Sequence, residues 1–175
     1  MLELLRHRRS VRFFETKAVD PEDIDRLIEA VLRAPTSRGF QPWEFIVVTE
    51  PDRLEKLAAA KGHGSAFLGR APLAFVIAAQ TAKSDVWIED CAIAAIILQL
   101  TAESLGLGSC WAQIRKRPHD AGTSADAYVR ELVGLPDSFA VECIIGIGHP
   151  AEDKTPHPAS SLLHSQVHFE SYIPD

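Results

Sequence analysis

The chain has 175 residues, of which 46% are hydrophobic, and a formal net charge of -6 at pH 7. This length and apolar content are sufficient for one domain with a substantial core. The negative charge argues against a general binder of nucleic acid or of membrane surfaces, because both would repel the protein. Residues 2–5 form a short apolar patch followed by arginines, the reverse order of a secretory signal, so we expect a cytoplasmic protein.

A basic segment follows a short helix that we expect over residues 1–6. The segment, residues 6–12, contains four of the 18 lysines and arginines of the chain. Val11, Phe13 and Phe14 interleave with these charges, so part of the segment must be buried and some arginines must point towards an anion. Guanidinium groups with a serine hydroxyl suit a phosphate dianion, because they form charge-assisted hydrogen bonds in a fixed geometry. A solvated run of charges is the alternative.

The next helix is predicted to start at Asp20, its N-cap, with Pro21 in the first helical position, and to end before Pro35. Residues 34–43 then form a polar loop with two prolines. Its hydroxyl and amide side chains can meet the polar edges of a ligand, or the loop can serve only as a connection.

A long helix is predicted from Trp87, with Ser84 or Asp85 as its N-cap and Gly106 as its left-handed stop. Every residue from 91 to 98 is apolar, so this helix must be covered on all sides. The apolar run is too short to span a membrane. Because a small domain rarely covers a helix completely by itself, we expect a second copy of the chain on one side, as in a homodimer.

The remaining elements complete an α+β fold around a single sheet, because helices and strands mix without strict alternation. The expected strands cover residues 44–49, 72–79, 109–114 and 140–147, and two further helices cover 52–60 and 124–132. Residues 62–70 contain glycines and are expected to form a mobile loop. We predict one domain over residues 1–175, in which residues 151–175 form an arm that packs on a dimer partner, since it would otherwise fray.

The cysteines and histidines do not indicate a metal site. Cys91, Cys110 and Cys143 lie in apolar contexts without Cys-x-x-Cys spacing, so we expect buried, reduced thiols. Histidines crowd the C-terminal region, but the prolines around them and the lack of a helical period do not favour zinc. We find no Ser-His-Asp set, phosphate-binding Gly-x-x-x-x-Gly-Lys or dinucleotide fingerprint. An anion site without a catalytic constellation indicates that a cofactor carries the chemistry.

Four motifs in series resemble the nitroreductase family of FMN flavoproteins, in particular a short single-domain branch of it. They are Arg8-Arg9-Ser10-Val11-Arg12; Ala34-Pro35-Thr36-Ser37 with Gln41-Pro42-Trp43; Leu105-Gly106-Leu107-Gly108-Ser109-Cys110-Trp111; and Gly146-Ile147-Gly148-His149-Pro150-Ala151-Glu152. The resemblance covers nearly the whole chain. It implies a nitroreductase-like fold, with a mixed or antiparallel sheet of four to five strands flanked by helices. It also implies an intertwined homodimer with two FMN sites at the interface.

The resemblance assigns roles to the motif residues. Arg8, Arg9 and Ser10 would hold the FMN phosphate. Arg12 would lie by the pyrimidine edge of the flavin, where a cation stabilises the negative charge of the reduced ring, and is thus the candidate catalytic residue. The polar loop would come from the partner chain, and backbone groups of residues 112–114 would lie near flavin N5. The implied cofactor-binding residues are Arg8, Arg9, Ser10, Arg12, Pro35, Thr36, Ser37, Gln41, Trp111, Ala112, Gln113 and Lys154.

This sequence departs from the family pattern at two places. Gly39 stands where many relatives carry an asparagine, and a basic residue usual after the last strand is represented by Lys154, with Arg115 or Arg117 as substitutes.

The implied function is an FMN-dependent oxidoreductase. It would take a hydride from NADH or NADPH and reduce nitroaromatics, quinones or similar small acceptors in a ping-pong cycle through flavin N5. Alternatives are a reductive dehalogenase or flavin-modifying member of the same fold, a non-catalytic FMN-binding protein, and an RNA or DNA binder that uses residues 6–12.

Overall fold

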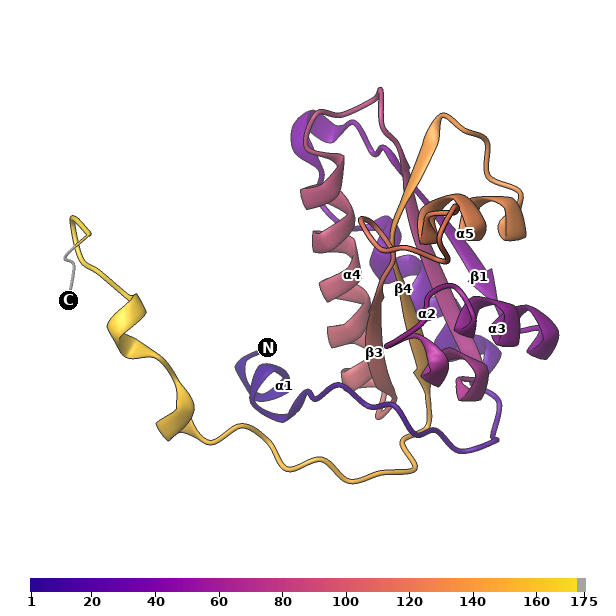
Figure 1. The fold of residues 1–175 in the computed structure, drawn as a ribbon. Helices are drawn as coiled ribbons and strands as arrows, with labels where there is room; N and C mark the ends of the chain where they lie inside the picture. The colour runs from indigo at the N-terminus through magenta and orange to yellow at the C-terminus, as the bar shows by residue number, and fades with distance from the viewer. Residues whose placement is uncertain (173–175) are drawn as a thin grey trace.

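The computed structural model describes residues 1–172 and is built on a four-stranded antiparallel sheet of order β1-β2-β4-β3 (Figure 1). The expected strands are all present, each end differs from the expected one by one residue, and the sheet is antiparallel throughout. Their bounds are Trp43–Val48 for β1, Leu73–Gln80 for β2, Gly108–Gln113 for β3 and Phe139–Gly148 for β4. The central strands β2 and β4 are buried on both faces, as their continuous apolar sequences require.

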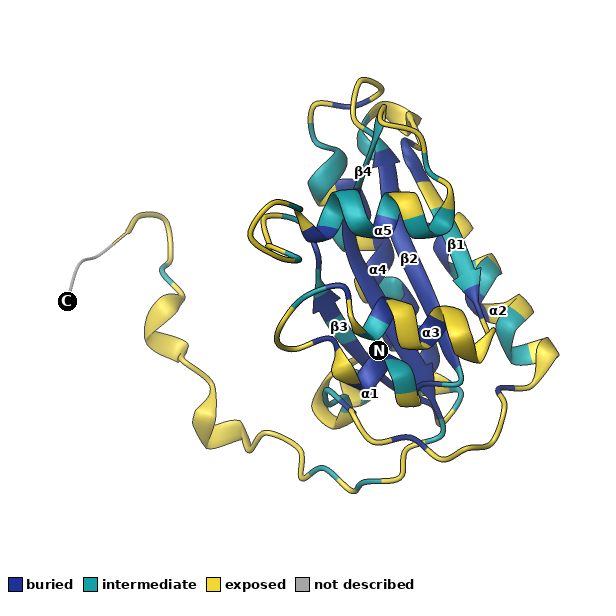
Figure 2. Cartoon of the chain, turned by 45° about the vertical axis from the view of Figure 1, so that its right-hand side comes forward, coloured by how far each residue is buried: buried dark blue, intermediate teal, exposed yellow. Residues whose placement is uncertain are grey.

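Helices cover both faces of the sheet (Figures 1 and 2). The α-helices are α1 (Leu2–His7), α2 (Pro21–Leu32), α3 (Pro51–Ala58), α4 (Trp87–Ser104) and α5 (Ala125–Val133). Four short 3-10 helices are η1 (Ser37–Gly39), η2 (Ala66–Arg70), η3 (Ala159–Ser161) and η4 (His164–Gln166). The expected helices are confirmed, as is the predicted cap Asp20, which accepts from the Glu22 amide. The structure adds a second cap, Ser124, whose side chain accepts from the Ala127 amide at the start of α5.

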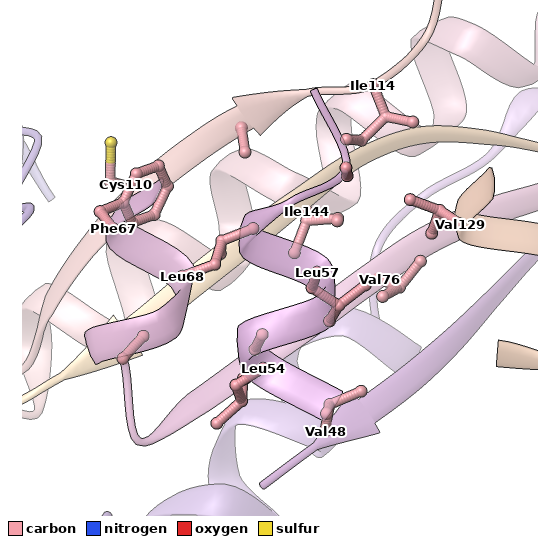
Figure 3. Close-up of a cluster of buried hydrophobic side chains, with 14 of the residues drawn as sticks. Val48, Leu54, Leu57, Phe67, Leu68, Val76, Cys110, Ile114, Val129 and Ile144 are labelled. Carbon is pink, nitrogen blue, oxygen red and sulfur yellow. The ribbon is translucent and has the colours of Figure 1, made fainter. Parts of the chain in front are cut away.

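Two hydrophobic clusters hold these layers together. On one face, α2 and α4 pack against Phe75 and Ile77 of β2. On the other face, α3, η2 and α5 pack against Val76 and Ile144, as Figure 3 shows. The alternation of Phe75, Val76 and Ile77 between the two clusters follows the two-residue period of a strand.

The segment 62–70 differs from the expected mobile loop. Phe67 and Leu68 are buried, and η2 packs against α3 and β4. Gly146 makes room for them, because a Cβ atom there would lie 2.9 Å from Phe67 Cε2 and 3.0 Å from Leu68 Cδ2. Sequence periodicity misses this turn because its partners are distant in the chain.

The long helix α4 begins differently from the prediction. Its N-cap is Val86, and neither Ser84 nor Asp85 caps the backbone; instead the Ser84 hydroxyl donates to Asp90 Oδ2 at 3.0 Å. Gly106 stops the helix in the left-handed region, with a φ of 74°, as expected. Most of the helix is covered by the chain itself, but Ile93 and Ile96 remain 38% and 39% exposed. One apolar side of α4 is therefore open.

The C-terminal arm leaves the body after β4 and extends away from it (Figures 1 and 2). Its large apolar side chains are exposed, with Phe169 at 84% and Leu163 at 64%. The last three residues of the predicted arm lie outside the described residues. Among residues 1–172, no helix combines the length and apolar content needed to cross a membrane.

Candidate functional site

The basic segment lies along the edge strand β3. Ser10 forms a parallel bridge with Ser109, and the Val11 amide donates to the Ser109 carbonyl at 3.0 Å. The Val11 side chain is buried against Gly108. Because Val11 anchors the segment, its neighbours in the sequence, Ser10 and Arg12, are also held next to β3.

Glu152 fixes the same segment from the other side. Its Oε1 accepts from the Arg12 amide at 2.7 Å and from the Phe13 amide at 3.3 Å, while Oε2 lies 2.8 Å from Lys154 Nζ. The Arg12 amide and then Lys154 lower the pKa of Glu152, so this carboxylate stays charged. The carboxylate thus joins the start of the C-terminal arm to the basic segment.

These contacts gather Arg9 and Lys154 around one hollow. The Arg9 guanidinium donates to the Thr155 carbonyl, and Lys154 is held by Glu152. The hollow has a volume of about 310 Å³ and lies at the end of α4 where β3 begins. Its polar lining consists of His7, Arg9, Glu103, Glu152, Asp153 and Lys154. Lys154 therefore lies close to Arg9 of the basic segment, in a hollow that three carboxylates also line.

The buried thiol of Cys110 follows Ser109, the residue of β3 that Ser10 and Val11 contact. Burial raises the pKa of Cys110, and the charge of Arg12, a hydrogen bond with Ser10 and the charge of Arg8 oppose that rise. Within the described residues, none of Arg8, Arg9 and Arg12 forms an ion pair with a carboxylate. This edge of β3 therefore presents positive charge that the chain itself leaves uncompensated.

The far end of β3 is held by a partly buried polar network. Trp111 Nε1 donates to Gln113 Oε1 at 3.0 Å, and Gln113 Nε2 donates to the carbonyls of Arg115 and Glu142, each at 3.2 Å. Burial raises the pKa of Glu142, whereas Gln113 and Arg115 act in the opposite direction. Because the Gln113 side chain is engaged at both ends, only backbone groups of this stretch are available to a ligand.

The polar loop lies at the start of α4. The Ser37 amide donates to Asp90 Oδ1 at 2.8 Å, and the Gln41 amide donates to Thr36 Oγ1 at 3.0 Å. Gly39 has a φ of 68°, in the left-handed region where asparagine is also tolerated. A glycine in place of the usual asparagine therefore preserves the backbone shape but removes an amide side chain.

One chain does not bring all the predicted residues together. The loop with Thr36, Ser37 and Gln41 lies at the start of α4, whereas the basic segment lies near its end (Figure 1). The helix has 18 residues and is therefore about 27 Å long. A ligand that contacts both groups needs the loop of a second copy.

Two residues, one at this site and one beyond it, were not expected from the sequence. Glu152 was recognised only as part of a motif, and its role as the anchor of Arg12 depends on a contact between residues 140 positions apart. Lys61 lines a second hollow beside β3 together with Arg117. No local pattern indicated Lys61, since it follows the end of α3 in a short connection.

Comparison with known proteins decides the family. The model of the nitroreductase family matches residues 5–64 and 55–149. The chain belongs to the nitroreductase family. This membership confirms the resemblance and identifies the chain as an oxidoreductase.

Individual nitroreductase relatives agree with this assignment over the full length. A solved FMN-dependent nitroreductase from Clostridium difficile R20291 has a TM-score of 0.97 and 44% identity, covering 98% of this chain and 100% of its own. A protein of Archaeoglobus fulgidus, provisionally named NADH dehydrogenase/NAD(P)H nitroreductase, is 31% identical over 98% of each chain. An iodotyrosine deiodinase of Haliscomenobacter hydrossis is 27% identical over 91% of this chain and 68% of its own. The nitroreductase fold predicted from the sequence is thus confirmed.

Proposed function

We propose that this nitroreductase-family chain is an FMN-dependent NAD(P)H oxidoreductase that reduces nitroaromatics, quinones or similar small electrophilic acceptors. The observation that carries the proposal is the position of the basic segment along β3, where Ser10 and Val11 contact Ser109 and where, among the described residues, Arg8, Arg9 and Arg12 form no ion pair with a carboxylate. Such uncompensated guanidinium groups require an anion. The family membership and the FMN-dependent relative support the choice of a flavin phosphate.

The residues present fit FMN. Arg8, Arg9 and Ser10 would bind its phosphate, with Lys154 completing the charge from the arm. The carboxylate of Glu152 does not oppose this arrangement, because two backbone amides and Lys154 already occupy its oxygens. Trp111, Ala112 and Gln113 would lie along the flavin, with the backbone of residues 112–114 facing N5.

Arg12 is the residue that we expect to act on the reaction. When bound, FMN supplies a ring that takes a hydride at N5 from NADH or NADPH and delivers the electrons to an acceptor. The Arg12 guanidinium, next to the pyrimidine edge, would stabilise the negative charge that reduction places there. Glu152 Oε1 accepts from the Arg12 amide at 2.7 Å, so the backbone that carries this guanidinium is held in place before the ligand binds.

A homodimer would complete the site. Pro35, Thr36, Ser37 and Gln41 of one chain would contact the flavin bound to its partner, which explains why they lie at the opposite end of α4 from Arg8. The open side of α4, with Ile93 and Ile96, supplies the apolar surface for the contact.

The arm, residues 151–175, would pack on the same partner. Its exposed side chains, Phe169 and Leu163, would need an apolar surface to pack against. A hollow of about 420 Å³ beside the free edge of β1, lined in part by Ile28, Leu32 and Phe45, provides one. We therefore regard residues 1–175 as one domain with an exchanged arm.

The decisive experiment begins with the purified chain reconstituted with FMN. We expect a yellow dimer that bleaches anaerobically with NADH or NADPH and regains colour when nitrofurazone or a quinone is added. Since one open flavin face admits the donor and the acceptor in turn, double-reciprocal plots should give parallel lines.

Other outcomes identify the alternatives. A yellow protein that neither nicotinamide bleaches is a non-catalytic FMN binder, and reoxidation by a halophenol but not by nitrofurazone indicates a dehalogenase. A colourless monomer in excess FMN refutes the proposal.

A further inference from the structure

A second hollow lies beside β3, where the connection after α3 meets the loop after β3. Its volume is about 350 Å³, and its charged and polar lining consists of Lys61, His63, Arg117, His119 and Asp120. None of these side chains has a role in the function proposed above. The hollow therefore combines two permanent cations, two imidazoles and a single carboxylate.

The two cations have no counterion among the residues that the structure describes. Within residues 1–172, neither Lys61 nor Arg117 has a carboxylate within ion-pair distance. Burial and then the positive charge of Arg117 lower the pKa of Lys61, which shows that the two like charges act on each other.

Asp120 does not neutralise this pair. Its Oδ1 accepts from the amides of Gly122 and Thr123, each at 2.8 Å, and its Oδ2 lies 4.0 Å from His119 Nε2. An external anion would therefore stabilise the hollow by compensating Lys61 and Arg117 together.

The walls of the hollow are held in place before any ligand arrives. The buried Ser65 hydroxyl donates to the carbonyls of Ala58 and Lys61, at 2.8 and 3.2 Å. The His119 ring stacks on Tyr128 with centroids 4.0 Å apart, and the Tyr128 hydroxyl donates to the Lys56 carbonyl at 3.0 Å. A ligand thus meets a preformed site, which reduces the entropy lost on binding.

The hollow is adjacent to the proposed flavin site. The Arg117 amide donates to the Ile114 carbonyl at 3.1 Å, and Ile114 ends the stretch 112–114 whose backbone would face flavin N5. A molecule that lies over the flavin can therefore reach the two cations with a substituent.

We propose that Lys61 and Arg117 form a subsite that binds an anionic group, a carboxylate or a phosphate, of a molecule that reacts at the flavin. The inference rests on the proposed function, and it adds a substrate preference to it. The anionic group has two possible sources: the carboxylate of an acceptor, or the 2'-phosphate that distinguishes NADPH from NADH.

The test compares Lys61→Met and Arg117→Gln with the wild type and with Lys83→Met, an exposed lysine after β2. Steady-state KM values are measured for 4-nitrobenzoate against 4-nitrobenzyl alcohol, and for NADPH against NADH. Each subsite variant should raise the KM of one anionic compound about tenfold, the effect expected for a lost charge-assisted hydrogen bond. The KM of its neutral counterpart, the FMN content and the behaviour of Lys83→Met should stay unchanged.

The pattern of KM changes identifies the source of the anion. A change confined to 4-nitrobenzoate indicates an acceptor carboxylate, and a change confined to NADPH indicates its 2'-phosphate. Equal changes for anionic and neutral compounds, or no change, overturn the subsite. Arg117→Gln provides an exposed second variant should Lys61→Met fail to fold.

Calorimetric titration of the flavin-loaded protein with 4-nitrobenzoate and with 2'-phosphoadenosine 5'-phosphate separates the subsite from the reaction. If Lys61→Met binds either compound about tenfold more weakly than the wild type does, the subsite is supported, even if the wild type reduces no acceptor. If the wild type oxidises NADH with 4-nitrobenzyl alcohol but neither anion binds, the proposed function stands and the subsite is refuted.

Discussion

Gly108 is the residue whose substitution best tests whether the contact between the basic segment and β3 creates the FMN site. A Cβ atom added at Gly108 would lie 2.8 Å from Val11 Cβ and Cγ1, and 3.0 Å from Cγ2. Ordinary carbon contacts begin at about 3.5 Å, so Gly108→Ala forces Val11 away by about 0.7 Å. That movement stretches the 3.0 Å hydrogen bond from the Val11 amide to Ser109 and carries Ser10 and Arg12 with it.

The expected magnitude follows from the cost of overpacking. One extra methyl group in a tight contact destabilises a protein by about 1–3 kcal/mol. If all of this falls on the bound state, the FMN Kd rises about 5- to 150-fold. If it falls on the fold, Tm decreases by about 2–4 °C for each kcal/mol. We therefore expect weaker FMN binding, a lower Tm, or both.

The assay is fluorescence titration of the apoprotein with FMN, together with thermal unfolding. Gly122→Ala is the matched control, since the nearest atom to a Cβ there is Asp120 Oδ1 at 3.9 Å. Combining Gly108→Ala with Val11→Ala removes two of the three close atoms, so the double variant should be impaired by less than the sum of the single variants. Wild-type FMN affinity and Tm in Gly108→Ala, or strict additivity in the double variant, would refute the reasoning.

Three further predictions concern Arg12, Glu142 and the thiols. Arg12→Gln should retain FMN but slow anaerobic flavin reduction by NADH about a hundredfold in stopped flow, and an unchanged rate would contradict its role. Because burial raises the pKa of Glu142, the folded state binds this proton more tightly than the unfolded state, so unfolding free energy is lost as pH rises from 4.5 through the raised pKa. Glu142→Gln should abolish that loss, which urea unfolding of both proteins between pH 4 and 8 measures. If the unfolding free energies of the variant and the wild type differ by the same amount at every pH, the prediction is wrong. Burial raises the pKa of Cys91 to about 12 and also raises the pKa values of Cys110 and Cys143. Ellman's reagent should therefore label no thiol in the native protein and three after denaturation. Rapid labelling of the native protein would argue against the buried core.

The sequence alone determined the local elements and the family. Helix α2 was predictable because Asp20, Pro21 and the apolar period are all local signals, and Gly106 marked the end of α4 by its tolerance of a positive φ. The arginine motif indicated an anion site because its charges and apolar residues are neighbours in the chain. These features depend on interactions over a few residues, which periodicity and capping record.

Only the tertiary structure decided how these elements meet. The order β1-β2-β4-β3, the burial of Phe67 under Gly146 and the attachment of Arg12 to Glu152 all join residues far apart in the chain. The hollow that Lys61 and Arg117 both line likewise arises where separate connections converge. Local sequence carries no record of such contacts, because packing and hydrogen bonding between distant segments depend on the complete fold.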